Sequence, residues 1–407
     1  MGTLRFLREN APWLTAGMLL TFLSSFGQTF FISVFAGEIR ETFALSHGAW
    51  GGIYTLGTTV SAIVMIWAGS LTDRFRARAL GAVVLCLLAL ACLSMASVPA
   101  AWMLPGVIFL LRFGGQGMTS HIAMVAMARW FVATRGKALS VATLGFALGE
   151  ALLPVIFVAL LALYDWRLLW GVAALIALAG IPVLLILLQT ERTPQSMARE
   201  NQSVGMNARH WRRAEALRHW LFWFMVPALL GPAAFNTAFF FQQVHLAEVK
   251  GWAHVELVAM FPIYTAVGIG SMVLSGWLLD RVGTARLIPF FQLPMVGAFI
   301  VFATASTLWA ALPGFVLLGL TTGANSTLPN AFWAEFYGTA HLGAIKAMAA
   351  AVMVFGSAIG PGVTGTLIDL GVGIEMQFLG IAAYFVFASV MMWIGVTRAR
   401  PALPATA

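Results

Sequence analysis

The sequence predicts an all-α, polytopic membrane protein made of two related halves, and three observations support this fold class. Hydrophobic residues make up 60% of the chain and charged residues only 9%, far below the roughly 25% charged residues of soluble domains. Apolar runs of about 20 residues, the length that crosses a bilayer, recur from end to end. Several motifs also return at a constant offset of 207 residues, which is the trace that a duplicated half leaves.

The apolar runs predict twelve transmembrane helices. Backbone amides inside hydrocarbon must be satisfied within one segment, so each run is expected to be helical. The first run is too long for a signal peptide and lacks a small-residue cleavage site. In chain order the expected helices cover residues 12–35, 48–68, 79–97, 102–124, 138–162, 167–189, 220–246, 255–277, 286–303, 308–330, 344–367 and 376–396.

The repeated motifs divide the chain into two pseudo-symmetric six-helix bundles. The stretch Gly69-Ser-Leu-Thr-Asp73-Arg74 returns as Gly276-Trp-Leu-Leu-Asp280-Arg281. The same offset relates Gly136 to Gly343, Gly149 to Gly356 and Pro154 to Pro361. We therefore predict an N-terminal bundle over 1–189, a cytoplasmic linker over 190–219 and a C-terminal bundle over 220–407.

The positive charges predict the orientation of the chain in the membrane. The net charge is +8, but if twelve helices alternate, the Lys and Arg residues of the loops gather on one side. Only Arg40, Arg167 and Lys250 fall on the other side, and Arg112 lies inside a helix. Because basic loops face the cytoplasm, both termini are expected there, with the bacterial inner membrane as the expected location. The basic balance reflects topology and does not predict a nucleic-acid partner.

No sequence motif predicts catalysis or a bound metal. The chain contains no His-Glu-x-x-His, Gly-x-Ser-x-Gly or paired-cysteine motif. Its two cysteines, Cys86 and Cys92, share one apolar segment and are expected to be buried free thiols. We therefore expect a protein that is not an enzyme and that binds no cofactor and no metal.

The first repeated motif resembles a family signature. Gly69, Leu71, Asp73, Arg74 and Arg78 match the pattern G-x-L-x-D-R-x-x-x-R, found between helices two and three of the major facilitator superfamily. The resemblance covers nearly the whole chain and implies transport by rocking of two six-helix halves. In that family the Asp and Arg form a cytoplasmic charge network that links the halves in one conformation. The resemblance extends this gating role to Asp280, Arg281 and Glu335.

A narrower resemblance surrounds helices four and five. The stretches Trp130-Phe131, Arg135-Gly136-Lys137 and Asp165-Trp166-Arg167 are similar to the monocarboxylate and oxalate/formate branch, which moves small organic anions. Members of that branch commonly carry basic residues inside helix one, eight or eleven. This chain has no Lys or Arg in the interior of those helices, which favours the alternative of drug or metabolite efflux.

Two ionisable residues lie at similar depth inside predicted helices four and five. Arg112 is about ten residues from the outer end of its helix and Glu150 about twelve from the inner end, so both lie roughly 15–18 Å deep at 1.5 Å per residue. A charge at mid-bilayer costs about 3 kcal/mol or more, and we predict that the two side chains interact. Arg112 and Gln116 also match an R-x-x-x-Q-G motif, similar to one in many proton-coupled members. Glu150 is then the proton-binding group; the alternative is a permanent ion pair that only fixes the two helices.

Large polar side chains near mid-depth predict the lining of a central cavity. Gln28 in helix one, Asn236 in helix seven and Asn325 in helix ten are expected to contact substrate, together with Tyr264 in helix eight. Single small hydroxyls in these helices are expected to make interhelical hydrogen bonds only. His121 in helix four is interpreted as a hydrogen-bonded histidine in preference to a proton relay.

Together these features predict a secondary transporter. A small organic solute, with a monocarboxylate or another organic anion as the expected class, would bind between the halves and cross by alternating access, coupled to protons as a symporter. The expected partners are the solute, protons and the lipid bilayer, and the expected state is a monomer. Efflux of drugs or metabolites is the alternative within transport. A membrane sensor or receptor that binds without transport is the alternative of another class.

Overall fold

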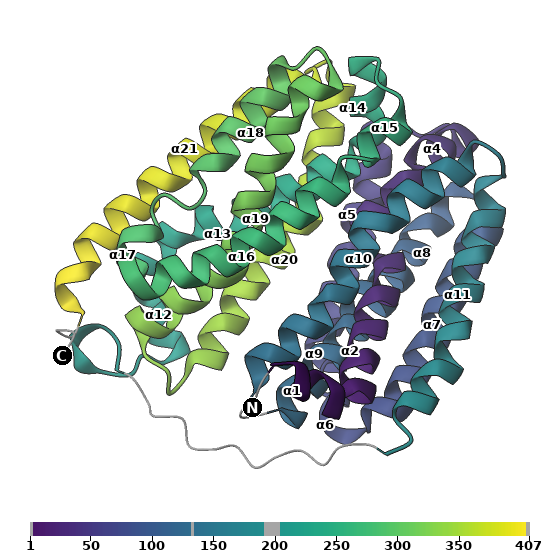
Figure 1. The fold of residues 1–407 in the computed structure, drawn as a ribbon. Helices are drawn as coiled ribbons and strands as arrows, with labels where there is room; N and C mark the ends of the chain where they lie inside the picture. The colour runs from purple at the N-terminus through teal and green to yellow at the C-terminus, as the bar shows by residue number, and fades with distance from the viewer. Residues whose placement is uncertain (1–2, 132–133, 191–203, 404–407) are drawn as a thin grey trace. The chain divides into compact units, whose positions relative to one another are not determined.

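The computed structural model describes residues 3–131, 134–190 and 204–403, and all regular structure within this part is helical. The chain divides into two compact units, unit 1 over Met1–Arg199 and unit 2 over Glu200–Ala407. The division falls inside the predicted linker 190–219, of which residues 191–203 lie outside the described part. Figure 1 shows the helices of both units.

In unit 1, helical segments are short up to residue 43 and mostly long thereafter. The first group is α1 (Thr3–Glu9), α2 (Ala11–Leu23), η1 (Ser24–Gly27), α3 (Thr29–Ile32), η2 (Ser33–Phe35) and α4 (Ala36–Phe43). The second group is α5 (His47–Ala68), α6 (Leu71–Arg74), α7 (Ala77–Ser97), η3 (Ala101–Met103), α8 (Leu104–Leu111), the π-helical η4 (Arg112–Thr119), α9 (Ser120–Trp130), α10 (Arg135–Leu161) and α11 (Trp166–Leu187).

Unit 2 begins with two short elements and continues with long helices. The short elements are η5 (Met206–Ala208) and α12 (Arg213–Arg218). The others are α13 (Trp220–Phe241), α14 (Gln243–Lys250), α15 (His254–Val258), α16 (Phe261–Val282), α17 (Thr284–Leu287), α18 (Leu293–Thr304), α19 (Leu308–Tyr337), α20 (Leu342–Asp369), α21 (Ile374–Ala399) and η6 (Arg400–Ala402).

Nine helices in the described part of the chain are long and apolar enough to cross a membrane, or ten when the bent pair Ala11–Gly27 and Thr29–Phe43 counts as one span. The other two predicted spans, 102–124 and 286–303, fall on α8–η4–α9 and on α17–α18. The first of these is interrupted by the π-helical segment, and the second contains only a shorter apolar helix. The protein is therefore an all-α, multi-pass membrane protein, while the count of twelve spans stays a prediction.

The helix boundaries follow the sequence repeat. α10 begins at Arg135 and α20 at Leu342, and α9 ends at Trp130 and α19 at Tyr337. Both pairs are 207 residues apart, which is the offset of the repeated motifs. The duplication predicted from the sequence is thus confirmed as two copies of one helical pattern.

The outside of the described chain carries many large apolar side chains, as a bilayer requires. Trp67 of α5, Val83 of α7 and Ile186 of α11 are 67%, 66% and 63% exposed. The same orientation corrects the expectation for the cysteines: Cys92 is buried, but Cys86 is exposed. Cys86 lies three residues after Val83 on α7 and therefore shares its lipid-facing side.

The described end of the predicted linker packs onto unit 2 and does not act as a simple connection. The Trp211 backbone amide donates to the carbonyl of Tyr337 at the end of α19 (3.0 Å). The Trp211 ring is 4% exposed and lies 5.6 Å from the Tyr337 ring and 4.7 Å from the ring of His219. Residues 204–219 thereby attach α12 and the start of α13 to the end of α19.

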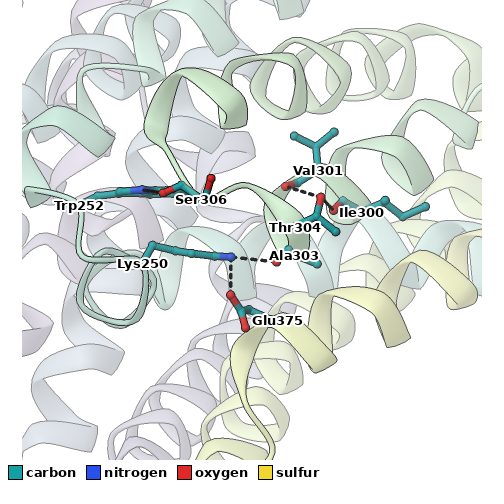
Figure 2. A network of polar contacts seen from close by, with 8 residues as sticks. All are labelled: Lys250, Trp252, Ile300, Val301, Ala303, Thr304, Ser306 and Glu375. Atoms are coloured by element: carbon teal, nitrogen blue, oxygen red, sulfur yellow. Dashed lines mark hydrogen bonds and ion pairs between the residues drawn. The ribbon is translucent and has the colours of Figure 1, made fainter.

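One lysine joins three helices of unit 2 at the end that the charge distribution assigns to the outside, here called the outer end. Lys250 Nζ donates to the carbonyl of Ala303 (2.8 Å) and to Glu375 Oε1 (2.5 Å), as Figure 2 shows. Ala303 belongs to the last turn of α18, where carbonyls have no amide of their own helix to accept from. A cation there also interacts favourably with the helix dipole. Lys250 therefore ties α14 and α21 to the end of α18.

Unit 1 caps the equivalent carbonyl from a different helix. Ala96, 207 residues before Ala303, accepts from Arg167 Nη1 (3.1 Å), which also donates to the carbonyl of Val98 (2.8 Å). The Arg167 guanidinium lies over the ring of Trp166, 4.5 Å from its centroid. The outer ends of both units are thus closed by a cation on the end of the third helix, but the cation comes from the start of α11 in one case and the end of α14 in the other.

Candidate functional site

The first apolar helix of unit 1 is broken near the middle of its length. The backbone of Gln28 is extended (φ −89°, ψ 154°), and the segments on either side are bent by 47°. The Gln28 carbonyl accepts from the amides of Phe31 (3.2 Å) and Ile32 (3.0 Å). In an uninterrupted helix, Phe31 would donate to Gly27 four residues earlier. The break therefore releases the Gly27 carbonyl from the helical pattern.

Two facing glycines allow the π-helical segment to approach this break. A Cβ atom on Gly115 would lie 2.6 Å from Gly27 Cα and 2.9 Å from the Ser24 carbonyl oxygen, too close for any side chain. The segment Arg112–Thr119 is π-helical, and the Thr119 hydroxyl donates to the Gly114 carbonyl five residues earlier (2.6 Å). Short π-helical segments inside membrane helices are frequent at functional sites.

Arg112 supplies the donor that the broken helix needs. Its side chain is 1% exposed, and Nη1 donates to the Gly27 carbonyl (3.1 Å) and to Thr29 Oγ1 (3.4 Å). The guanidinium also lies 5.3 Å from the centroid of the Tyr54 ring. Nε is buried without a hydrogen-bond partner. These contacts are all with neutral groups, so they satisfy hydrogen bonds of Arg112 without neutralising its charge.

The helix that carries Glu150, α10, approaches the same break at Gly149, on which a Cβ atom would lie 2.9 Å from Ser25 Cβ. Glu150 is the next residue of this helix and is 9% exposed. Both η4 and α10 therefore pack against the η1 segment of helix one. The direct interaction of Arg112 with Glu150 stays a prediction; the structure shows that the helical segments carrying the two residues both pack against the η1 segment.

The two predicted amides in this region have different surroundings. Gln28 forms the break itself and is 9% exposed. Gln116 lies within the π-helical segment and is half-buried. Gln28 was predicted to contact substrate through its side chain. In the structure its extended backbone also forms the break in helix one.

In unit 2 the predicted polar residues converge on one hydroxyl. Thr322 Oγ1 of α19 accepts from Asn236 Nδ2 of α13 (3.2 Å) and from the Tyr264 hydroxyl of α16 (3.3 Å). Asn236 Oδ1 is buried without a hydrogen-bond partner. Asn325 lies one helical turn further along α19 and is half-buried. The structure thus joins three helices through Thr322, which the sequence presents only as one of several small hydroxyls.

The polar groups of the two units occupy related positions with different chemistry. Thr29 and Asn236 are 207 residues apart, so each unit has a polar contact between its first and fourth helices at the same place. Position 319 corresponds to Arg112 and is a glycine, and a Cβ atom there would lie 2.6 Å from the Tyr264 carbonyl oxygen. Where unit 1 holds a buried cation, unit 2 has direct contact between helix backbones.

The predicted gating loop of unit 1 is held in place by side chains of helix four. His121 Nε2 lies 3.2 Å from the Gly69 carbonyl oxygen, and Arg129 Nη1 donates to the Thr72 carbonyl (2.7 Å). The interpretation of His121 as a hydrogen-bonded histidine is confirmed. Arg129 was not predicted as part of this loop, and only its basic side chain at the inner end of helix four could have indicated the role.

Of the remaining gating residues, Arg78 and Arg281 make contacts inside their own units. Arg78 Nε donates to the Leu185 carbonyl (3.3 Å), and Arg74 is exposed. The side chain of Asp73 lies outside the described part. In the second copy, the Arg281 guanidinium lies 4.1 Å from the centroid of the Trp277 ring, and Asp280 is exposed. Glu335 is half-buried near the end of α19. The charge network between the halves stays a prediction.

A family model agrees with this architecture. The model described as Major Facilitator Superfamily matches residues 17–345, most of the chain. The chain belongs to this superfamily. It is therefore a multi-pass membrane protein of a transporter family.

Two curated relatives from Bos taurus are similar over parts of the superfamily fold. Facilitated glucose transporter member 8 of solute carrier family 2 is 31% identical over 115 residues, which are 26% of this chain and 24% of that protein. Monocarboxylate transporter 13 is 25% identical over 288 residues, which are 69% of this chain and 64% of that protein. The chain thus spans less than two thirds of the length of each.

Solved structures match the fold over almost the whole chain. A bacterial homologue of the human lysosomal transporter Spinster, in an inward-facing and unoccupied conformation, has a TM-score of 0.73 and 16% identity, and the match covers 98% of this chain and 99% of that one. The nucleoside transporter NupG has a TM-score of 0.71 and 15% identity, with 94% and 98% covered. At these identities the likeness concerns the fold alone.

Proposed function

We propose that the protein is a secondary transporter for a small organic anion, with monocarboxylates as the leading class, and that Arg112 and Glu150 couple the anion to a proton. The observation that carries the proposal is the guanidinium of Arg112, which is 1% exposed and contacts neutral groups. A cation inside a membrane protein needs a counter-charge to offset its loss of hydration. A substrate carboxylate that reaches Arg112 supplies that charge.

Competition between two carboxylates would couple the anion to a proton. In the absence of substrate, ionised Glu150 balances the charge of Arg112. When a substrate anion binds to Arg112, Glu150 takes up a proton, so that the site again carries one positive and one negative charge. One proton then accompanies each anion, which makes the protein a symporter.

The other predicted residues take supporting roles in this proposal. The break at Gln28 lets the two parts of helix one change their angle without loss of helical hydrogen bonds, as broken helices do in transporters that alternate access. Gln116 lies beside Arg112, and the uncharged part of the solute contacts Asn236, Tyr264 and Asn325. The gating residues are Gly69, Asp73, Arg74, Arg78, Asp280, Arg281 and Glu335. The protein is proposed to be a monomer in the bacterial inner membrane with both termini in the cytoplasm.

The similarity to Monocarboxylate transporter 13 over 69% of the chain supports the choice of substrate class. The alternative of efflux is favoured by the absence of Lys and Arg from the interior of predicted helices one, eight and eleven. The direction of transport separates the two functions.

Uptake into proteoliposomes tests the proposal. We expect labelled lactate or pyruvate to accumulate faster when the lumen is alkaline, and Glu150→Gln to abolish this stimulation while anion exchange continues. Glu256→Gln removes an exposed carboxylate from α15 and is the matched control. Stimulation that survives Glu150→Gln contradicts the coupling role. Export of cationic dyes without carboxylate uptake supports efflux, and binding without uptake supports a sensor.

A further inference from the structure

A basic groove lies at the end of unit 1 opposite its outer end, remote in sequence from the break in helix one. Its volume is about 610 Å³. Among the described residues that line it none is acidic, and four are arginines: Arg74, Arg76, Arg78 and Arg129. Several positive charges around one concave surface raise the local concentration of anions.

Two of these arginines build the walls of the groove. Arg129 on α9 fixes the loop before α7 through the Thr72 carbonyl (2.7 Å), and Arg78 on α7 reaches the Leu185 carbonyl near the end of α11 (3.3 Å). Arg74, Arg76 and Arg78 are exposed, so their guanidinium groups can meet a ligand from solution or from the membrane. The groove therefore has a fixed frame and an accessible basic rim.

Exposed apolar side chains lie in the lining of the groove and close to it in sequence. Its lining includes Leu188 at the end of α11 and Phe75, which is 56% exposed. Within two helical turns of the lining, Val83 on α7 and Ile186 on α11 are 66% and 63% exposed. A ligand with both an anionic head and an apolar tail matches this succession of surfaces, whereas a free phosphate would use only the arginines.

We infer that this groove binds an anionic phospholipid, with its phosphate among Arg74, Arg76 and Arg78 and its acyl chains along Val83 and Ile186. Guanidinium groups bind phosphate through paired hydrogen bonds, which makes arginine better suited than lysine to such a site. The positive-inside distribution assigns this end of the chain to the cytoplasm, where the leaflet carries anionic lipids that attract basic segments. The bound lipid would connect the loop before α7 to the end of α11.

Binding of short-chain lipids to the purified protein in an uncharged detergent tests this inference without a transport assay. The probes are dihexanoyl phosphatidylglycerol, phosphatidylcholine with the same chains, and glycerol 3-phosphate. We expect phosphatidylglycerol to bind about tenfold more tightly than either of the others. The double variant Arg76→Gln/Arg78→Gln is expected to lose about tenfold in affinity for phosphatidylglycerol. Arg213→Gln/Arg218→Gln removes the same charge from exposed positions of α12 and is expected to bind like the wild type.

Three outcomes overturn the inference. They are equal affinity for phosphatidylglycerol and phosphatidylcholine, an unchanged affinity in Arg76→Gln/Arg78→Gln, and binding of glycerol 3-phosphate as tight as that of the lipid. If the glutamine variant does not fold, Arg76→Lys/Arg78→Lys keeps the charge and loses the paired hydrogen bonds, so a smaller but measurable loss is expected. The comparison of the three probes on the wild-type protein needs no variant.

Discussion

The first helix of unit 1 is broken, whereas its counterpart in unit 2 is continuous, although the positions of proline suggest the reverse. Between Thr29 and the start of α2 the only proline is Pro12, in the first turn. α13 runs unbroken from Trp220 to Phe241 although Pro227 and Pro232 lie inside it. The contacts from helix four explain the difference. In unit 1, Arg112 donates a hydrogen bond to the released Gly27 carbonyl. In unit 2, the position that corresponds to Arg112 is a glycine, which has no side-chain donor. A membrane helix breaks where a neighbour can satisfy the released carbonyl.

The outer ends of the two units also meet one backbone requirement with different side chains. Phe43 holds the position that corresponds to Lys250, and its ring lies 5.8 Å from Cζ of Arg167. Each unit keeps a cation on the last carbonyls of its third helix, but the duplicated halves supply it from different helices. The backbone requirement is common to both units, and the side chain that meets it is not.

Replacement of Arg112 is the strongest test of the difference between the first helices. We expect Arg112→Ala to lower the initial rate of anion uptake about 100-fold and to destabilise the protein by about 1–3 kcal/mol, because the Gly27 carbonyl loses a charged donor. Arg112→Lys keeps the charge and should retain part of the uptake rate and part of the stability. Uptake at the wild-type rate in Arg112→Ala would show that the cation only supports the break.

Closing the space between the two glycines should have the next largest effect. Gly115→Ala puts a methyl group against the backbone of Gly27, so we expect a loss of about 1–3 kcal/mol in the free energy of unfolding. Gly106→Ala on α8 has no atom within 4 Å of the new Cβ and is the matched control. Unfolding of both variants in detergent measures the difference, and equal stability would mean that η4 does not need close approach to helix one.

Removal of the outer cation of unit 2 tests the comparison of the outer ends. The Lys250 side chain is 6% exposed, so Lys250→Met should cost about 1–2 kcal/mol through the loss of its bond to Ala303. The Glu375 side chain is 53% exposed, so Glu375→Gln should cost less than about 1 kcal/mol. If the two variants were equally destabilised, the ion pair and not the helix cap would dominate.

The smallest expected effect is a pH dependence of the packing of residues 204–219 against the end of α19. Unit 1 has no described counterpart of this pH dependence. Burial, and then the nearby positive charge of Arg209, lowers the pKa of His219 below its ordinary value of 6.5. The folded state therefore favours neutral His219. Its contribution to stability is complete above pH 6.5 and decreases as the pH falls from there through the folded-state pKa.

Limited trypsin cleavage of the segment 204–219 measures this effect. We expect faster cleavage at pH 5.5 than at pH 7.5, after correction for the pH dependence of the protease, and a flatter profile in His219→Gln. His341→Gln changes an exposed histidine at the start of α20 and should keep the wild-type profile. The same profile in His219→Gln as in the wild type would assign the pH dependence to another group.

The sequence was sufficient to predict the apolar helices, the duplication and the burial of Arg112, because hydropathy and charge report directly on the bilayer. It did not predict the break at Gln28, which depends on a donor 84 residues away in the chain, nor the π-helical form of η4. The role of Thr322 was not predicted either, because it depends on the two side chains that donate hydrogen bonds to its hydroxyl. Features that depend on one side chain meeting one backbone atom leave no periodic signal in the sequence.

The bend in helix one also bears on how the protein fits the thickness of its membrane. From Ala11 to Phe43 the chain contains roughly 50 Å of helix at 1.5 Å per residue, well beyond the roughly 30 Å of hydrocarbon. A straight helix of this length would carry Glu38, Arg40 and Glu41 far into water. The 47° bend shortens the reach of the outer part along the axis of the inner part, which would allow α4, with its charged side chains, to lie at the headgroup level. Lipids of different thickness would then change the angle at Gln28 and, through it, the contact between Gly27 and Arg112.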